Sequence, residues 1–279
     1  MIRNFTNNDM NEIIDIYTRE NKPTYEEIEN IRNSKQILVY DEDGIKGFIH
    51  MNVYENKCDF EMGISSEEHI KSIGSQLWAE AKKRMEGNSV TSINTCHIKN
   101  GIWEGFFDEI GFDYWFSYYK LKYISGKYKE PELDVKKYED EYYMQEISLE
   151  SEAFSKLRAE NDITPHNWYL SASKDTLAHH RKERLIDKDN FYLFFKEGEM
   201  IGAAIIANAE IPLFFVNSKY QGEGYGRKIL EFAVNRGLEQ DPNGVDLEVL
   251  ASNEKALQLY TSTGFEIIQG YVNRRLQIV

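Results

Sequence analysis

The sequence is poor in the residues that build disulfide scaffolds, metal sites and membrane spans. Its 279 residues include only two cysteines, Cys58 and Cys96, without CxxC spacing, which excludes a disulfide framework and a cysteine-based zinc site. Both have apolar or β-forming neighbours and are expected in the core. No apolar run reaches the roughly 18 residues of a membrane helix, and residues 1–9 contain no run of signal-peptide length. We therefore expect a cytoplasmic protein that does not bind membranes.

Positive charge is also scarce. The chain has 33 Lys and Arg against 47 Asp and Glu, a formal net charge of −14. Such a chain repels polyanions unless it carries a local basic patch, and none is visible, so no nucleic-acid partner is expected. The acidic excess could attract a cationic amine substrate; solubility is the simpler explanation.

The length exceeds the roughly 100–200 residues of one domain, and a weak internal repeat indicates two. A glycine enters an amphipathic helix at Gly74 and again at Gly226, 152 residues later. A glycine that follows a helix and precedes a phenylalanine occurs at Gly111 and again at Gly264, 153 residues later. Glycine is common just after a helix end, but two landmarks at nearly one offset indicate a duplicated unit.

We predict a domain over residues 1–125, a polar linker over 126–142 and a second domain over 143–279, each of mixed α/β structure. In the second domain, turn signals and hydrophobic periodicity predict a hairpin, a third strand, a helix capped by Gly237, a fourth strand and a last helix. The expected ranges are 190–196 and 200–207 for the hairpin, then 211–216, 227–236, 245–249 and 253–263.

A glycine-rich segment follows the expected strand over 211–216 and precedes a helix, an order that creates an anion site from unpaired N–H groups and the helix dipole. Gly222, Gly224 and Gly226 would let a diphosphate approach the backbone. The P-loop pattern GxxxxGK[ST] is absent, and GxGxG after a hairpin differs from the Rossmann fingerprint. Because Asp246 lies about where a ribose-binding acid would, a dinucleotide site stays open, as does a purely structural turn.

Two segments, 216–227 and 247–265, resemble motifs A and B of the GNAT superfamily of N-acyltransferases. The pattern Q/R-x-x-G-x-G/A fits Gln221, Gly224 and Gly226. The second segment has the order strand, Asn253, Ala256, Tyr260 and Gly-Phe. The resemblance covers about 80 residues strongly. It implies two tandem GNAT-like domains, each a mixed, mostly antiparallel sheet flanked by helices, with acetyl-CoA as cosubstrate and no metal.

The resemblance also implies a cofactor site between two splayed strands. Phe214, Phe215 and Val216 would offer backbone contacts to pantetheine, and Asn253 and Ala256 would border the CoA arm, although Asn253 could equally be a plain helix N-cap. The pyrophosphate would rest on the amides of Gln221, Gly222, Glu223, Gly224, Tyr225, Gly226 and Arg227.

Two residues match catalytic positions of the family. Tyr260 corresponds to the tyrosine that protonates the leaving CoA thiolate, for which a phenol is suited, although it could simply pack in the core. Glu210 corresponds to the catalytic glutamate of the histone acetyltransferase branch, although it could be an exposed edge carboxylate and the nearby Pro212 departs from that branch. The expected reaction is acetyl transfer to a primary amine of a small molecule or peptide. The alternatives are a non-catalytic acyl-CoA sensor and an aminoacyl-tRNA-dependent transferase.

The first domain lacks most of these residues. At the equivalent positions it has His69, Ile70 and Ser72, and Phe107 replaces the tyrosine. A branched side chain such as Ile70 would hinder a diphosphate from reaching the backbone. We predict that this domain keeps the fold and has lost, or nearly lost, CoA binding.

Other side chains carry weaker signals. His179 and His180 are adjacent, so on a helix they point about 100° apart and do not form a metal pair. Trp168, Tyr169 and His166 are candidates to line the acceptor pocket, or are packing residues.

Overall fold

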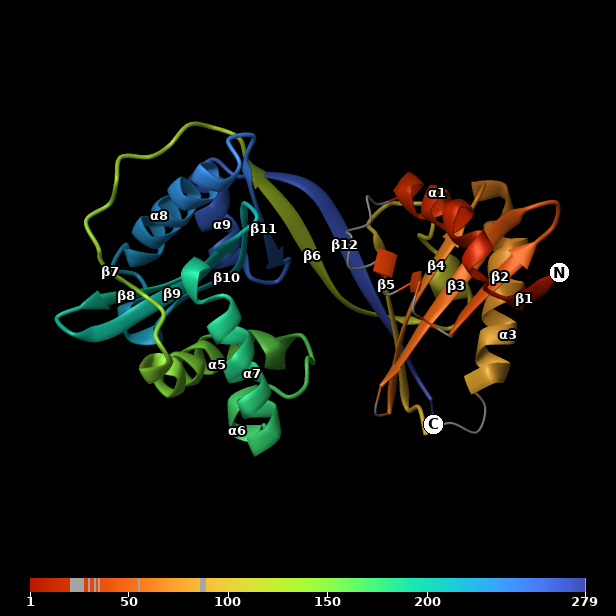
Figure 1. Cartoon of the computed structure of the whole chain (residues 1–279), viewed down its shortest axis with the longest axis horizontal. Helices are drawn as coiled ribbons and strands as arrows, with labels where there is room; N and C mark the ends of the chain where they lie inside the picture. The colour runs from red at the N-terminus through yellow and green to blue at the C-terminus, as the bar shows by residue number, and fades with distance from the viewer. Residues whose placement is uncertain are drawn as a thin grey trace. The chain divides into compact units, whose positions relative to one another are not determined.

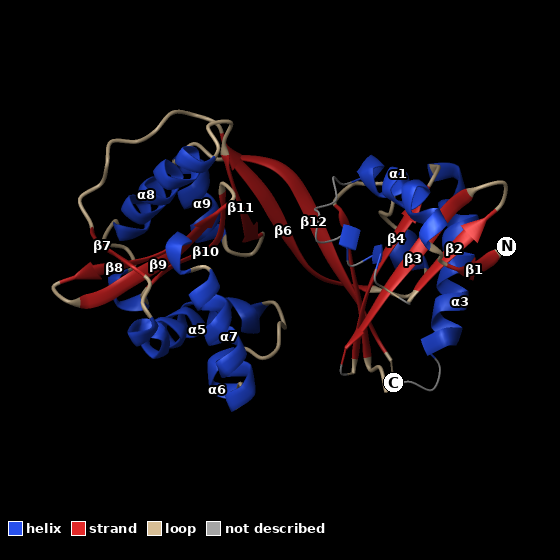
Figure 2. Ribbon diagram, in the orientation of Figure 1, coloured by secondary structure: helices blue, strands red, loops and turns tan. Residues whose placement is uncertain are grey.

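The computed structural model describes residues 1–20, 28–29, 31–32, 34, 36–54, 56–85 and 89–278. The chain forms two compact units: unit 1 comprises Met1–Phe116 with Tyr271–Val279, and unit 2 comprises Ser117–Gly270. Each is a mostly antiparallel sheet flanked by helices (Figures 1 and 2), so the predicted α/β class is confirmed. None of the described helices is long and apolar enough to cross a membrane.

Unit 1 is a sheet in the order β1-β2-β3-β4-β5, completed by the last residues of β12. Neighbouring strands are antiparallel except β4 and β5, which pair in parallel from Lys57↔Ser92 to Phe60↔Thr95. Its elements are β1 Ile2–Asn4, η1 Asn7–Asp9, α1 Met10–Glu20, β2 Ile37–Asp41, β3 Ile45–Tyr54, β4 Lys57–Ile64, η2 Glu67–His69, η3 Ile70–Gly74, α3 Ser75–Met85, β5 Ser92–Ile98, α4 Phe106–Glu109 and the start of β6 Asp113–Tyr123.

Helices cover both faces of this sheet. Alternation along the strands sends Leu38 and Ile49 to one face, where they pack with Leu77 of α3, and Val39 to the other, where it packs with Ile13 of α1. This division follows from the period of two along a strand.

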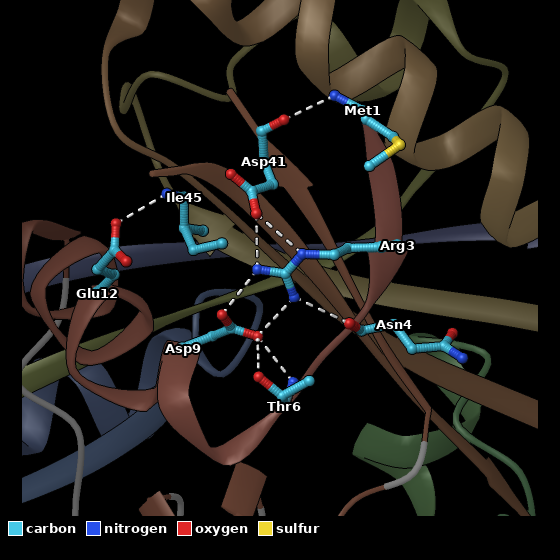
Figure 3. A network of polar contacts seen from close by, with 8 residues as sticks. All are labelled: Met1, Arg3, Asn4, Thr6, Asp9, Glu12, Asp41 and Ile45. Atoms are coloured by element: carbon cyan, nitrogen blue, oxygen red, sulfur yellow. Dashed lines mark hydrogen bonds and ion pairs between the residues drawn. The ribbon is translucent and has the colours of Figure 1, made fainter. Parts of the chain in front are cut away.

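An ion-pair network joins β1 and η1 to β2 (Figure 3). The guanidinium of Arg3 donates to both carboxylate oxygens of Asp9 at 2.8 Å and to Asp41 at 2.9 Å. Asp9 also accepts from the backbone N–H of Thr6 at 2.7 Å. The bonds from Arg3, with smaller help from Thr6, hold the pKa of Asp9 at about 2, so this carboxylate stays charged at any physiological pH.

Unit 2 has the sheet order β6-β11-β10-β9-β8-β7, antiparallel except for β10 and β11. Helices α8 and α9 cover one face and α5 the other (Figure 1). Its elements are β7 Asp134–Lys137, η4 Asp140–Tyr142, α5 Tyr143–Glu160, α6 Trp168–Ser171, α7 Lys174–Ile186, η5 Lys188–Asn190, β8 Phe191–Lys196, β9 Glu199–Ala207, β10 Glu210–Val216, η6 Ser218–Tyr220, α8 Tyr225–Gln240, β11 Val245–Leu250, α9 Glu254–Ser262 and the start of β12 Glu266–Gln277.

The compact units differ from the predicted division at residues 125 and 143. The end of β6, from Tyr118 to Tyr123, pairs with β11 in unit 2, whereas Tyr271–Gln277 of β12 pair with β5 in unit 1. Buried Arg274 anchors this last segment: its Nε donates to Nε2 of His97 at 3.2 Å, and its guanidinium pairs with Asp108. The end of the last strand of each repeat therefore pairs in the sheet of the other repeat. A single boundary along the sequence cannot describe this exchange.

The second repeat landmark has the same geometry in both units. Gly111 and Gly264 have φ of +94° and +90°, the left-handed conformation that favours glycine. The following phenylalanine N–H donates five residues back in each case, from Phe112 to Phe107 at 2.9 Å and from Phe265 to Tyr260 at 3.1 Å. Phe107 and Tyr260 therefore occupy equivalent places.

Two local expectations were wrong. Gly237 does not cap a helix, because α8 continues to Gln240; a Cβ at Gly237 would lie 2.6 Å from Cγ2 of Val245, so this glycine permits close packing of α8 on β11. Cys58 is buried as expected, but Cys96 is exposed because it lies on the outward side of β5.

Candidate active site

Strands β10 and β11 form a V in unit 2. Their described pairing is limited to Glu210↔Asp246, supported by a bond from the Asp246 N–H to the Ala209 carbonyl at 2.9 Å. Two residues further along β10, Pro212 has no N–H to donate, and the register of β10 against β9 is irregular between Glu210 and Leu213. The strands part beyond this point, as the family resemblance implies.

A cleft of about 530 Å³ lies at the open end of this V. Its walls come from β10, the glycine turn, the start of α9 and one side of α5. Nine of the predicted site residues line it: Phe214, Phe215, Val216, Gln221, Gly222, Gly226, Asn253, Ala256 and Tyr260. Residues distant in sequence are thus brought to one cavity.

The glycine turn is shaped to receive an anion. Gly222 and Gly224 have φ of +86° and +87°, and a Cβ on either would point into open space. Gly224 is the N-cap of α8, whose first N–H groups have no acceptors within the helix. A diphosphate can approach these amides because no side chain stands above them, so the turn fits the pyrophosphate of CoA.

Four predicted residues of the turn are not among those that line the cleft: Glu223, Gly224, Tyr225 and Arg227. Glu223 pairs with Lys196 at 3.3 Å, and the Lys196 ammonium lies 5.3 Å from the Tyr225 ring centre. Arg227 donates to the hydroxyl of Ser262 at 2.9 Å. These contacts hold the turn in place, and the backbone amides of the four residues stay predicted CoA contacts.

Tyr260 lies on α9 with only 6% of its surface exposed. Its ring centre is 6.1 Å from that of Phe214 and 6.0 Å from that of Phe265. Burial raises the pKa of its phenol above the usual 10, so the group keeps its proton at neutral pH. No hydrogen bond from its hydroxyl is found within the described chain, and the residue lines the cleft. The proton is therefore available to a ligand.

One wall of the cleft was not foreseen from the sequence. Ala153, Phe154, Lys156, Leu157 and Glu160 of α5 line it, and α5 is joined to both arms of the V. Glu152 accepts from the Ser218 hydroxyl after β10 at 2.9 Å, and Asn161 donates to Ser252 after β11 at 2.8 Å. The core positions of α5 include Glu146 and Ser151, so its hydrophobic pattern is weak.

Asn253 is the N-cap of α9 and accepts from the Ala256 N–H at 3.3 Å. A capping role and a position beside the CoA arm are thus compatible, as expected.

The structure does not place Glu210 in this cleft. Glu210 lines a separate pocket of about 250 Å³ at the closed end of the V and pairs with Lys120 at 3.4 Å. Glu248 lines the same pocket, although it was not identified as a candidate residue from the sequence. The alternation Val245, Leu247, Val249 along β11 is the signal that could have found it, because it sends Glu248 to the opposite face.

The aromatic and histidine candidates lie elsewhere. Trp168 and Tyr169 pack against the core between α5 and the sheet, and His180 contacts the Trp168 ring at 4.7 Å. His166 is exposed. His179 pairs with Glu183 at 3.3 Å. In the described ranges, no three His, Cys, Asp or Glu residues are grouped as metal ligands.

At the corresponding site of unit 1, His69, Ser72 and Ile73 still line a pocket of about 410 Å³, but the residues around it differ from those of unit 2. Ile70 and Ile73 are buried in the core, and a Cβ on Gly74 would lie 3.0 Å from Cζ of Phe106. Phe107, the counterpart of Tyr260, is 1% exposed. These contacts favour the predicted loss of CoA binding in this unit.

A family model described as an acetyltransferase (GNAT) domain matches residues 157–275. These residues are a GNAT acetyltransferase domain. GNAT domains of this kind are acyl-CoA-dependent N-acetyltransferases, so the enzyme class predicted from the two motifs is confirmed. No curated protein matches the chain.

The GNAT fold extends over the whole chain. The chain is similar to a GCN5-related N-acetyltransferase from Sphaerobacter thermophilus. The TM-score is 0.75 and the sequence identity 14%, and the match covers 99% of this chain and 95% of that one. It is also similar to a tandem GNAT protein from the clavulanic acid biosynthesis pathway, with a TM-score of 0.63 and 12% identity over 99% and 98% of the two chains. At these identities the likeness concerns the fold, and the tandem GNAT-like architecture is confirmed.

Proposed function

We propose that unit 2 transfers the acetyl group of acetyl-CoA to a primary amine of a small molecule or peptide, by direct attack and without a covalent enzyme intermediate. The observation that carries the proposal is the single cleft that joins the open edge of β10, the glycine turn and Tyr260. Bound acetyl-CoA would supply the thioester carbon on which the amine acts.

The chain's own residues suit the binding of this cosubstrate. The N–H groups around Gly222 and Gly224 would hold the diphosphate, with the dipole of α8 behind them. Phe214, Phe215 and Val216 would offer backbone groups to the pantetheine amides, because β11 has separated from this part of β10. From Val216 back to Pro212 the strand runs about 13 Å, so the arm can extend from the turn towards the closed end of the V.

Catalysis would rest mainly on positioning. Near-ideal alignment of two reactants lowers a barrier by about 7–11 kcal/mol, whereas one general acid contributes about 10²–10⁴-fold in rate. Tyr260 would be that acid, because the residue lines the cleft and burial keeps its phenol protonated by raising its pKa.

The two rival functions have less support. A net charge of −14 disfavours a tRNA-dependent transferase. A non-catalytic sensor would bind acyl-CoA but release no thiol when amines are added.

Calorimetric titration with acetyl-CoA tests the binding site. We expect wild-type protein to bind, Gly226→Val to bind at least about tenfold more weakly, a loss of about 1.4 kcal/mol, and Gly126→Val to bind normally. Gly226 lines the cleft and has an ordinary φ, and Gly126 is an exposed glycine with nothing within 4 Å of its Cβ position. Thermal unfolding confirms that both variants fold. Absent binding, or equal binding by all three proteins, contradicts the proposal.

A further inference from the structure

The pocket at the closed end of the V is rich in carboxylates. Glu210, Asp246 and Glu248 line it together with Lys120, Ile211, Pro212 and Leu247. Three carboxylates thus share a space of about 250 Å³ with the Lys120 ammonium, and the Lys122 ammonium lies beside Asp246, so negative charge is in excess by one. A cation placed there would improve the charge balance of the pocket.

Two of the three carboxylates already have partners. Lys120 lies 3.4 Å from Glu210 and 3.5 Å from Asp246, and Lys122 lies 3.2 Å from Asp246. Glu248 forms no ion pair or hydrogen bond within the described chain. Desolvation raises the pKa of Glu248, and the charge of Glu210 adds to the rise against the opposing charge of Lys120. The Glu248 side chain is exposed on β11, so a ligand in the pocket can reach its carboxylate.

Glu248 also lies at the level along β11 where β10 and β11 separate. It lies two residues beyond Asp246, opposite Pro212 on β10, where the described pairing has ended. In unit 1 the corresponding residues by the repeat offset, Phe60 and Thr95, are still paired. The gap beside Glu248 is therefore specific to unit 2, and it opens at the end of the V towards which the pantetheine arm would extend.

The two faces of the sheet separate Glu248 from Tyr260. Val245, Leu247 and Val249 pack in the same core cluster as Tyr260 and α8. Because side chains alternate along a strand, Glu248 points to the other face. A thioester lying between the strands would have Tyr260 on one side and Glu248 on the other.

From this geometry we infer that Glu248, and not Glu210, receives the acceptor as a primary alkylammonium ion and takes its proton. The inference rests on the proposed function. One N–H proton passes from the ammonium to Glu248, and the freed amine nitrogen bonds to the acyl carbon. The C–S bond breaks, and the thiolate takes the phenolic proton of Tyr260. The surplus proton on the new amide nitrogen returns through solvent to the phenolate, and the proton on Glu248 is released, so one proton leaves per turnover.

The test compares two nucleophiles that differ in protonation. Ethylamine is an ammonium ion at neutral pH and needs a base, whereas hydroxylamine is mostly unprotonated and does not. CoA release from acetyl-CoA is measured for wild type, Glu248→Gln, Glu210→Gln and Glu266→Gln. Glu266 is an exposed glutamate of β12 for which no ion pair is found in the described chain, and its substitution serves as the control.

We expect Glu248→Gln to lose about 10²–10⁴-fold of the ethylamine rate at neutral pH, to regain part of it as pH rises towards the amine's own pKa, and to keep the hydroxylamine rate within a few-fold. Glu210→Gln should lose much less, and Glu266→Gln should match wild type. Equal ethylamine rates in Glu248→Gln and wild type, equal losses with both nucleophiles, or a larger loss in Glu210→Gln would overturn the assignment.

A binding measurement separates this inference from the proposed function. If wild type binds acetyl-CoA but releases no CoA with either nucleophile, the proposed transferase activity fails. The ammonium site is then decided by NMR: the ¹³C carboxyl resonance of Glu248 should shift on addition of ethylammonium chloride and not on addition of sodium chloride. No difference between the two salts would overturn the site itself.

Discussion

Replacing Tyr260 by phenylalanine should separate catalysis from folding. The change removes one hydroxyl that has no hydrogen bond within the described chain, and it keeps the ring contacts with Phe214 and Phe265. The free energy of unfolding should therefore change by less than about 1 kcal/mol. The equivalent position in unit 1 already holds Phe107 in a fully packed core, so phenylalanine suits this site of the fold.

The same change should slow CoA release by about 10²–10⁴-fold, or about 3–5 kcal/mol of transition-state stabilisation. The assay measures thiol release from acetyl-CoA with hydroxylamine, because the leaving thiolate needs a proton whichever nucleophile attacks. Affinity for acetyl-CoA, measured by calorimetry, should stay within a few-fold. Tyr192→Phe, a substitution on β8 outside the cleft, is the control. A Tyr260→Phe enzyme that releases CoA at the wild-type rate would refute the acid role, and one that unfolds more easily would refute the packing argument.

Three further outcomes follow from the two units. Titration should give one acetyl-CoA per chain, because unit 1 has Ile70 where unit 2 has Gly222, and Phe107 where unit 2 has Tyr260; two per chain would show that unit 1 still binds. Gly237→Ala should lower the free energy of unfolding by about 1–3 kcal/mol, because its Cβ would lie 2.6 Å from Val245; unchanged thermal unfolding would contradict the close packing. Asp9 has a folded pKa of about 2 against 3.8, so its stabilising contribution is complete above pH 3.8 and is lost as pH falls towards 2. Unfolding followed by circular dichroism should show this loss in wild type and not in Asp9→Asn.

Local patterns predicted most elements of unit 2, because their signals lie within a few residues. The strand over 211–216 and the helix after Asn253 were found to within a residue or two. Gly237 was misread, because glycine can mark either a helix end or a close approach of two backbones, and only the neighbouring strand distinguishes them. The exchange of closing strands could not be predicted, since the pairing of Arg274 and its neighbours with β5 depends on residues about 180 positions away.

The candidate site divides in the same way. Residues inside the two motifs were found because glycine turns and capped helices require particular residue types. The residues of α5 that line the cleft were not predicted, because this helix buries Glu146 and Ser151 and so has no clear apolar stripe. Glu248 was visible only as an ordinary alternating position. Its significance depends on Pro212 ending the pairing opposite it, which is a relation between two strands and not a motif.

Comparison of the two repeats supports the location of the proposed active site in unit 2. At three places where unit 2 leaves a group open, unit 1 has a residue that packs or pairs: Ile70 replaces Gly222, Phe107 replaces Tyr260, and the paired Phe60 and Thr95 replace Pro212 and Glu248. Each replacement buries apolar surface or adds strand pairing, which stabilises a fold. Unit 2 lacks that stabilisation at all three positions, and departures of this kind from a fully packed fold are expected where a ligand binds.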